Sequence, residues 1–349
     1  MIDARMMARK LMLGGAYWSG AAAIAQPHLA RAGAILMFHR ITDRVSSPLG
    51  VNNHLTITPE FLDALLNDLR SRGNVFVSMD ELLEALAKGR SRNLIAITAD
   101  DGWRDNFTEA LPVFEAYEAP FCVYIAPGLT SGSVAPWWEV LEDFVASRDR
   151  ISVPIENGRI EIECHDLSSK RKAADRLMNH LLAHVADADQ QDWLREIGAI
   201  SAETYDPSER FMTWDEIQEV QGHRLATIGA HTVNHYNLSK LTTEEAAREI
   251  LGSADVIEAK LGRRPRHLAF PYGSHRAAGA REAVLAHDVG FASAVTTRHG
   301  VLHPDHAKHL HALPRVSVNG YYQRLPYVRA LMSGLITPLA NGGRRLVTV

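Results

Sequence analysis

One stretch of this sequence indicates the fold class: residues 94–102 read LIAITADDG. The first six of these residues are apolar or β-branched, which predicts a short strand buried on both faces. Two aspartates, Asp100 and Asp101, follow at the carboxyl end of this strand. Consecutive side chains of an extended chain point to opposite sides, and Gly102 permits the turn that would bring both carboxylates to one site.

The same alternation of strand and helix continues along most of the chain. Helix starts are predicted by capping boxes, such as Ser78 with Glu81 and Thr213 with Glu216. The predicted strands cover residues 34–38, 75–78, 94–99, 121–126, 225–230, 267–270, 291–296 and 313–317. Such alternation predicts a parallel sheet or a closed barrel, with functional groups at the carboxyl ends of the strands. Periodicity alone does not distinguish the two.

One segment is too long for this repeat, because 130 positions separate Asp101 from His231. We therefore predict an insertion at about residues 131–212. Inside it, Asn157-Gly158 lies between two alternating apolar runs, which predicts a β-hairpin. An amphipathic helix is predicted to follow at about residues 170–186.

Two histidines come at the end of another predicted strand. His231 follows the run at 225–230, and His235 comes four residues later. Four residues are about one helical turn, so both rings can face one site. Two imidazoles and one carboxylate leave coordination positions open, as in catalytic zinc sites. Taken alone, the Asp-Asp-Gly sequence is also typical of a turn in which Asp caps the next helix.

Other histidines of the chain are not expected to bind metal. His180 and His184 also stand four residues apart, but the apolar stripe of their helix leaves them on its polar face or at its border. The run from His303 to His311 is rich in imidazoles but contains Pro304 and a cation, so we predict a loop that leads into a strand.

Three motifs together resemble those of the polysaccharide deacetylases, the nodulation-type and chitin-deacetylase-like carbohydrate esterases. These motifs are Thr98-Ala99-Asp100-Asp101-Gly102, His231-x-x-x-His235 and Phe270-Pro271-Tyr272-Gly273, in the family's order. The resemblance covers residues 33 to 318 approximately. It implies a distorted (β/α)7-type barrel, to which the hairpin-plus-helix insertion would be added.

The resemblance also implies roles for individual residues. Asp100 would be the general base, and the backbone N–H of Tyr272 would help to hold the oxyanion. Asp101, His231 and His235 would bind a divalent metal, with Zn²⁺ as the expected ion. The chain would then be a hydrolase of C–N bonds other than peptide bonds, which removes acetyl groups, here the N-acetyl of a hexosamine, from an oligo- or polysaccharide.

The third motif departs from the family pattern at Ala269. Many members have an arginine there, which contacts the catalytic aspartate. Two other arginines, Arg266 and Arg315, are candidates to replace it.

The family's late Leu-x-His motif, which supplies the general acid, has no clean match. His311 is our first candidate, with His309 beside it just before the last predicted strand. His39, at the end of the first predicted strand, is a rival candidate.

These departures leave two further functions open. The chain could be a saccharide-binding relative that has lost turnover, or an amidohydrolase that acts on a non-sugar amide. The Trp137-Trp138 pair of the insertion could stack on sugar rings, or it could simply anchor the insertion to the barrel.

Length and composition describe an ordinary globular enzyme of 349 residues, 46% of them hydrophobic. We expect an N-terminal helical segment at 1–32, a catalytic domain at 33–318 and a C-terminal extension at 319–349. The formal charge of −4 and the lack of long basic blocks argue against a nucleic-acid partner. Two cysteines do not make a disulfide framework.

The N-terminal segment has two interpretations. Arg5, Arg9 and Lys10 precede a weakly apolar run that ends in Ala23-Ile24-Ala25, as in a signal peptide. The run is also consistent with an amphipathic helix that packs on the barrel or makes peripheral contact with a membrane. We predict a cytoplasmic location, with periplasmic or secreted through residues 1–25 as the alternative.

Overall fold

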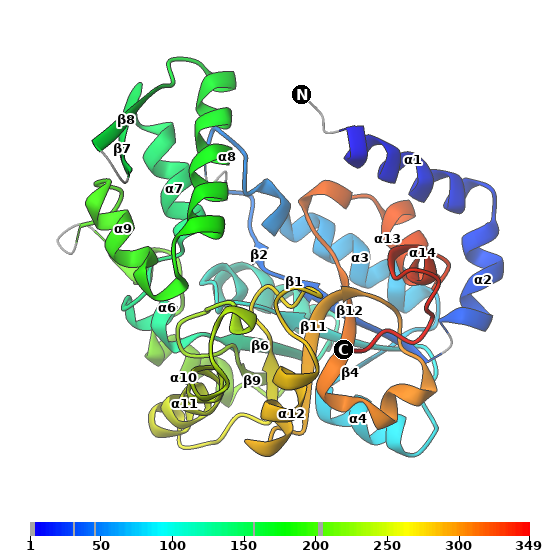
Figure 1. Cartoon of the computed structure of the whole chain (residues 1–349). Coiled ribbons are helices and arrows are strands. Elements are labelled where there is room, and N and C mark those ends of the chain that lie inside the picture. Colours follow the sequence, from blue (N-terminus) through cyan, green and yellow to red (C-terminus); the bar gives the residue numbers. More distant parts are fainter. Residues whose placement is uncertain (1–3, 31, 45–46, 156–157, 202–204) are drawn as a thin grey trace.

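The computed structural model describes residues 4–30, 32–44, 47–155, 158–201 and 205–349 (Figure 1). Within them, seven parallel strands close into a barrel. These strands are β1 (Gly33–Phe38), β5 (Leu94–Ala99), β6 (Phe121–Ile125), β9 (Ala226–Ala230), β10 (His267–Ala269), β11 (Ser293–His299) and β12 (Leu313–Ser317). Closure occurs at β1, which pairs with β5 on one side and β12 on the other. The predicted (β/α)7-type barrel is confirmed.

Strand β5 has a further neighbour, β4 (Val75–Val77), beside its first half. Residues 94–96 of β5 pair with β4, whereas residues 97–99 pair with β6. Two short strands, β2 (Arg40–Ile41) and β3 (Thr56–Ile57), pair with each other above the end of β1.

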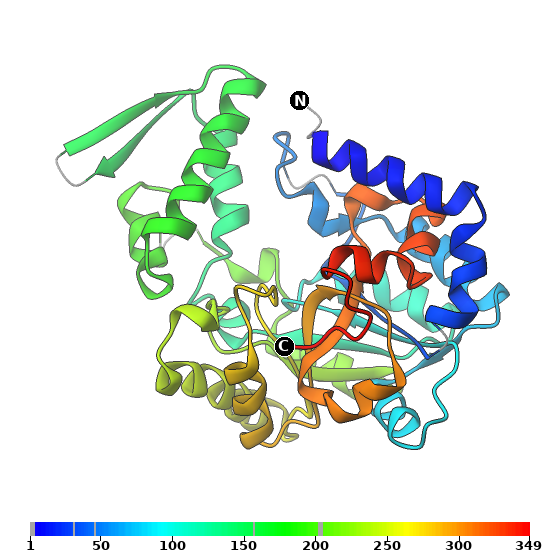
Figure 2. The same ribbon diagram turned by 45° about the vertical axis from the view of Figure 1, so that its right-hand side comes forward.

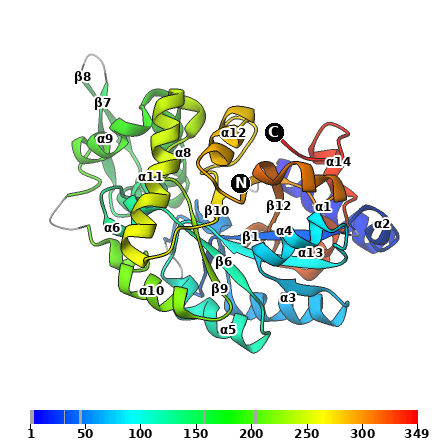
Figure 3. The same cartoon turned by 90° about the horizontal axis from the view of Figure 1, so that it is seen from below.

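Helices surround the barrel strands, as the view from below shows (Figure 3). They are α3 (Pro59–Ser71), α5 (Leu111–Ala116), α10 (Trp214–Gly222), α11 (Thr243–Leu261) and α12 (Ala280–Asp288), whereas α4 (Met79–Ala87) packs on the cluster inside the barrel. Helices α4 and α10 begin at the predicted capping boxes, which are formed in both directions at Ser78 and Thr213. The sequence signals for these helix starts are therefore confirmed.

The largest error in the predicted strands concerns β11, which begins at Ser293 instead of residue 291 and extends to His299. The amide of Phe291 donates to the carbonyl of Ala286, and the amide of Ala292 donates to that of Arg266. The first bond closes the turn after α12 and places Phe291 in that turn. The second joins Ala292 to the residue before β10, and the pairing of β10 with β11 begins directly after it.

The inserted segment rises from one side of the barrel (Figure 1). It contains α6 (Pro127–Ser131), α7 (Trp137–Ala146), β7 (Arg150–Ile155), β8 (Gly158–Glu163), α8 (Leu167–His184) and α9 (Gln190–Glu196). The predicted hairpin is present, because β7 and β8 pair antiparallel, although Asn157 of its turn lies outside the described residues. Helix α8 starts three residues earlier than predicted, since Asp166 caps it with Ser169 in place of Ser or Thr with Glu.

The two ends of the chain pack together. Helices α1 (Ala4–Trp18) and α2 (Ala21–Leu29) lie against α13 (Leu325–Met332), and α14 (Ile336–Ala340) follows. Leu13 of α1 is fully buried, and the Tyr17 hydroxyl accepts a 2.6 Å hydrogen bond from Arg329. No helix among the described residues is both long and apolar enough to cross a membrane. Figure 2 shows α1 and α8 rising at the same end of the barrel.

Candidate active site

The position of Asp100 follows from the period-two alternation of β5. Ile95, Ile97 and Ala99 pack outward against the helices, whereas Ala96 belongs to the core inside the barrel. The next inward residues are therefore Thr98 and Asp100. Both are buried, so Asp100 needs a partner inside the barrel.

That partner is Arg315 of β12. Its Nη1 and Nη2 atoms donate to the two carboxylate oxygens of Asp100 at 2.7 and 2.6 Å. The guanidinium is fully buried and also donates to the Thr296 carbonyl and the Thr98 hydroxyl, at 2.9 and 3.1 Å. Burial alone raises the pKa of Asp100, but the charge and hydrogen bonds of Arg315 lower it below its ordinary value. Asp100 is therefore an ionised carboxylate inside the barrel.

Arg315 thus makes the contact that the methyl side chain of Ala269 is too short to make. Ala269 is also part of the core inside the barrel, so the two positions face the same space from different strands. Arg266, the other candidate, pairs with Asp80 at 3.1 Å and is largely exposed. Of the two candidates, Arg315 is therefore the partner of Asp100 and Arg266 is not.

Asp101 is turned to the other side of the chain end by an unusual backbone. Its φ of 72° lies in the left-handed region, and Gly102 follows with φ 76°. This backbone conformation favours glycine at position 102, where a Cβ atom would also come within 2.8 Å of the Ile125 side chain. The indole Nε1 of Trp103 donates to Oδ2 of Asp101 at 2.9 Å. This bond fixes the carboxylate and leaves Oδ1 directed elsewhere.

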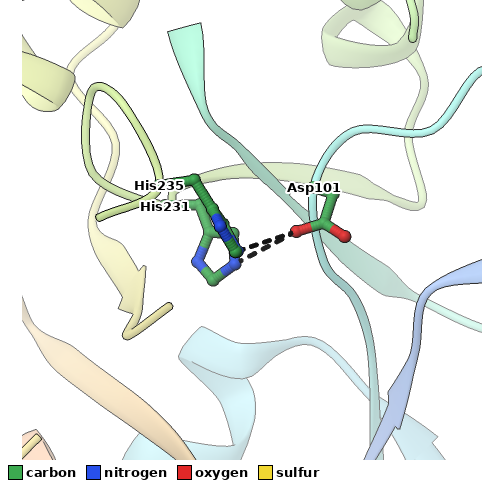
Figure 4. Close-up of side chains that lie close together, drawn as sticks. All are labelled: Asp101, His231 and His235. Carbon is green, nitrogen blue, oxygen red and sulfur yellow. Dashed lines mark ion pairs between the residues drawn. The ribbon is translucent and has the colours of Figure 1, made fainter. Parts of the chain in front are cut away.

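Oδ1 of Asp101 faces two imidazoles (Figure 4). It lies 3.3 Å from Nε2 of His231 and 3.4 Å from Nε2 of His235. Nδ1 of His231 is 2.7 Å from the Ala269 carbonyl oxygen. Because a carbonyl oxygen can only accept a hydrogen bond, Nδ1 carries the hydrogen and donates it. His231 therefore keeps its Nε2 lone pair for the site, the arrangement found in metal-binding histidines.

The positions of Oδ1 of Asp101 and of the two Nε2 atoms are better explained by a metal ion bound between them than by hydrogen bonds among them. Oδ1 of Asp101 is buried and has no hydrogen-bond partner among the described residues. Ligands at 2.0–2.1 Å from a tetrahedral ion are roughly 3.3 Å apart, which agrees with the distances above. Asp101, His231 and His235 are the one group in the described part of the chain that meets the geometric requirements for three such ligands.

The electrostatics of the two histidines differ. Burial lowers the pKa of His235 to about 4, so its ring is neutral at pH 7 and able to bind a metal. Burial also lowers the pKa of His231, but the close contact with the Asp101 carboxylate and the negative charges of Asp100 and Asp101 raise it more, with a net upward shift. The excess of negative charge therefore favours a cation at this point of the pocket.

Tyr272 lies next to this group on the turn after β10. Its φ is 60°, and its carbonyl accepts a 2.6 Å hydrogen bond from the Thr297 hydroxyl. Its ring contacts the ring of His235 at 5.2 Å between centroids, and its hydroxyl accepts a 3.1 Å hydrogen bond from Nε1 of Trp137. The residue is thus held at both ends. Its amide N–H has no partner among the described residues.

A pocket of about 480 Å³ opens above these residues. Asp100, Asp101, His231 and His235 form its base, together with His39. One wall comes from the insertion, as Trp137 and Trp138 of α7 and Met178 and Leu182 of α8; the other comes from Val51, Asn52, His54, Leu55 and Asn319. The pocket therefore has a polar, charged base and a mostly apolar mouth.

Buried carboxylates fix the insertion to the barrel rim. Glu142 of α7 accepts hydrogen bonds from the amides of Val51 and Asn52, at 2.8 and 2.9 Å. Arg40 donates to Glu139 of α7 at 3.4 Å, and its guanidinium lies 4.7 Å from the centre of the Trp103 ring. The insertion is thus connected to the residue that orients Asp101. The sequence analysis missed these roles, although the position of Trp103 directly after the Asp-Asp-Gly turn was a usable signal.

The two candidates for a proton donor lie in different places. Nε2 of His39 is 4.0 Å from Oδ2 of Asp100, at the base of the pocket. Nε2 of His311 instead lies 2.7 Å from the Phe291 carbonyl, and with His287 and His309 it lines a separate surface cavity. The structure does not bring His311 or His309 to the site, because both precede β12 and lie at its amino end, whereas the site lies at the carboxyl ends of the strands.

The histidines that we set aside also lie elsewhere. The rings of His180 and His184 contact each other at 5.2 Å on α8, with His184 exposed, and no third ligand accompanies them among the described residues. Nε2 of His306 lies 3.0 Å from the carbonyl of Val347. That histidine is buried under the C-terminal segment.

Solved structures with this barrel include known deacetylases. The deacetylase PplD of Streptococcus pyogenes, solved with acetate, is 20% identical over 82% of this chain and 92% of its own, with a TM-score of 0.53. IcaB of Ammonifex degensii is 18% identical over 87% and 97%, with a TM-score of 0.54. A Bacillus cereus polysaccharide deacetylase is 15% identical over 85% and 68%, with a TM-score of 0.52. At such identities the likeness shows the fold alone.

The sequence identifies the family. Residues 87–291, more than half of the chain, match the profile of the polysaccharide deacetylases, and the chain belongs to that family. A search of curated protein sequences gave no significant match. The chain is thus a hydrolase of a generally metal-dependent class that removes acetyl groups from polysaccharides.

Proposed function

We propose that this chain removes the N-acetyl group of hexosamines in an oligo- or polysaccharide, with a divalent metal ion held by Asp101, His231 and His235. The observation that carries the proposal is the pairing, at the base of one pocket, of an ionised Asp100 with a three-ligand group whose Oδ1 atom has no partner. The family supports acetyl removal from a polysaccharide. The hexosamine and the ion are the finer part of the proposal.

The ion that we propose is Zn²⁺, because two imidazoles and one carboxylate with open coordination positions form a typical catalytic zinc site. Bound there, the ion would polarise the acetyl carbonyl and make water more acidic. Trp103 and the Ala269 carbonyl support this assignment, since each orients one of the three ligands.

Asp100 is our candidate for the general base. Each of its oxygens accepts one hydrogen bond from Arg315 and keeps a further lone pair for a water molecule. Arg315 also keeps the carboxylate ionised, which is the form that accepts a proton. Asp100 would take the proton of the water that attacks the acetyl carbon.

The backbone N–H of Tyr272 is our candidate for an oxyanion donor. It has no partner among the described residues, and Thr297 and Trp137 hold its residue beside His235. One such donor contributes about 2.7–4 kcal/mol to stabilisation of the transition state.

We assign the proton donor to His39 in place of His311. His39 lines the pocket with its Nε2 atom 4.0 Å from Oδ2 of Asp100, so both side chains can contact the same substrate group. As the C–N bond breaks, His39 would protonate the amine, which leaves with the sugar while acetate remains.

The grounds for a binding protein without turnover are weaker after these observations. That alternative rested on Ala269 and on the missing general acid. Arg315 makes the contact with Asp100, and His39 is within reach. No observation favours a non-sugar amide.

The proposal is tested by acetate release from acetylated chitooligosaccharides and bacterial glycans. Protein stripped with chelator should be inactive, and zinc should restore release from at least one glycan. Tight zinc binding without release from any glycan would contradict the proposal. Release only from small acyl amides would replace it by the amidohydrolase alternative.

A further inference from the structure

Helix α1 has an unusual outward face. Its inner face is held on the barrel by Leu13 and Tyr17, which pack in the core or against it. The opposite face should be polar in an ordinary surface helix. Instead it carries Met7, Leu11 and Trp18, which are 43%, 69% and 78% exposed.

The spacing shows that this apolar face is continuous. Residues 7, 11, 15 and 18 are three or four positions apart, so they lie in one row along the helix. Met12 extends the row sideways, and Ile24 of α2, 73% exposed, extends it beyond the end of α1. Five of the 13 large exposed hydrophobic side chains found in the described part of the protein therefore fall within residues 7–24. Scattered apolar side chains are normal, but such a concentration marks a surface that contacts something.

Charge indicates what the contact is. Residues 4–30 contain Arg5, Arg9 and Lys10 and not a single acidic residue. Arg9 is exposed, and Lys10 is partly exposed. Lys10 borders the apolar row, whereas Arg9 projects from the opposite side of the helix toward the ring of the buried Tyr322. An apolar row with a cation beside it, in a segment without acidic residues and in a helix too short to span a bilayer, is the pattern of a helix that lies in the surface of an anionic membrane. Binding to a protein partner would not explain why residues 4–30 contain no acidic side chain.

Helix α1 is also close to the rim of the catalytic pocket. The guanidinium of Arg9 lies 5.4 Å from the centre of the Tyr322 ring. The neighbouring Tyr321 stacks on His54 at 5.5 Å, and His54 lines the pocket. Figure 2 shows α1 and the insertion at the same end of the barrel. A membrane in contact with the outward face of α1 would therefore lie near the apolar mouth of the pocket.

We propose that the outward face of α1 docks on an anionic lipid surface and that the acetylated glycan is carried at that surface. The second half of this proposal rests on the deacetylase function proposed above, and the first half does not.

Vesicle sedimentation tests the docking without any substrate. The full-length protein should sediment with vesicles of phosphatidylcholine and phosphatidylglycerol, and much less with phosphatidylcholine alone or at high salt. Leu11→Glu combined with Trp18→Glu should lower binding by about tenfold or more, because it places charges in the apolar row. Both side chains are mostly exposed, so the fold should not change.

Matched variants sharpen the result. Leu251→Glu makes the same change at a 42% exposed position on α11 and should bind like the wild type. Lys10→Gln should weaken binding to anionic vesicles by about fivefold, because it removes the cation beside the apolar row. Asp100→Asn should bind normally, since it alters only the pocket.

Three results would overturn the docking. Wild-type protein could remain in the supernatant, or Leu251→Glu could lose as much binding as the double variant. In the third case, vesicles would not bind and sedimentation velocity would show a dimer that the double variant dissociates, which would make a second copy of the chain the occupant of this face.

The glycan half is tested by rates on the same acetylated chitooligosaccharide, free or attached to a lipid in anionic vesicles. Wild-type protein should deacetylate the anchored form about tenfold faster, in proportion to its binding. The Leu11 and Trp18 variant should lose this gain but keep the rate on the free form. Equal wild-type rates on both forms would overturn the glycan half, whereas no rate on either form would contradict the deacetylase function and leave the docking result unaffected.

Discussion

The adjacent residues Asp100 and Asp101 lie in two halves of one pocket, and their negative charges are balanced in different ways. In one half, both oxygens of Asp100 are bonded to Arg315, and the charges are balanced. In the other half, Oδ1 of Asp101 faces only the edges of two imidazoles and has no partner among the described residues. The first half is complete without an ion, and the second is not. The contrast teaches that sequence neighbours acquire different chemistry from the strands across the barrel.

The contrast predicts its largest effect at the incomplete half. Asp101→Ala or His231→Ala should remove bound zinc and abolish turnover, because two ligands remain of three. Zinc content after dialysis and acetate release would measure this. His180→Ala, which changes a histidine outside the site, should leave both unchanged. A full complement of zinc with wild-type rate in Asp101→Ala would break the contrast.

The complete half should fail in a different way. Asp100→Asn keeps the shape of the side chain but cannot accept a proton as a carboxylate does. We expect zinc binding to remain and the rate to fall by about 10²–10⁴-fold. If the rate persisted with an unchanged pH profile, Asp100 would not be the base.

Removal of Arg315 should expose the cost of the balanced pair. Arg315→Met leaves a buried carboxylate without its counterion and should cost about 3–5 kcal/mol of unfolding free energy. Arg266→Met, which removes an exposed pair with Asp80, should cost about 0–1 kcal/mol. Urea unfolding of the metal-free proteins would compare the two.

The pH dependence of this loss has a definite sign. In the wild type the pKa of Asp100 is lowered on folding, so its contribution is present above the unfolded pKa and disappears as the pH falls through the folded one. In Arg315→Met, burial acts without the guanidinium and raises this pKa. The deficit should then grow as the pH rises from acid to neutral. A deficit independent of pH would mean that packing, and not charge, causes the loss.

The smallest effect should come from Trp103. Trp103→Phe retains the buried ring but removes the 2.9 Å hydrogen bond to Asp101. We expect zinc to bind about 10–100-fold more weakly, as for other groups that orient a metal ligand. Trp137→Phe removes a bond to Tyr272 in the same pocket and should leave zinc affinity unchanged. Equal affinities for Trp103→Phe and wild type would show that Asp101 needs no such support.

Local signals were sufficient for much of the fold. The buried run of β5, the capping boxes at Ser78 and Thr213 and the β7–β8 hairpin depend on residues close in sequence, and each was predicted. The start of α8 was missed because Asp166 with Ser169 is a less common cap. The start of β11 was missed because Phe291, although apolar, bonds to Ala286 in the turn after α12.

The site was only partly predictable for a physical reason. The three motifs lie at strand ends, and parallel strands bring such ends together, so the group of Asp101, His231 and His235 could be expected. The choice between Arg266 and Arg315, and between His39 and His311, depends on which residues face the interior and which end of a strand they occupy. Those facts follow from barrel closure and the register of β12, which local patterns do not specify.

The guanidinium of Arg315, in place of one at position 269, has a consequence for how such enzymes diversify. Residues that point into a barrel stack in layers to which several strands contribute. A guanidinium required beside the base can therefore be supplied from another strand of the barrel, provided that it reaches the same layer. One arginine could be gained before the other was lost, without an inactive intermediate. A search that demands the arginine at a fixed place in the third motif would overlook descendants that had made this exchange.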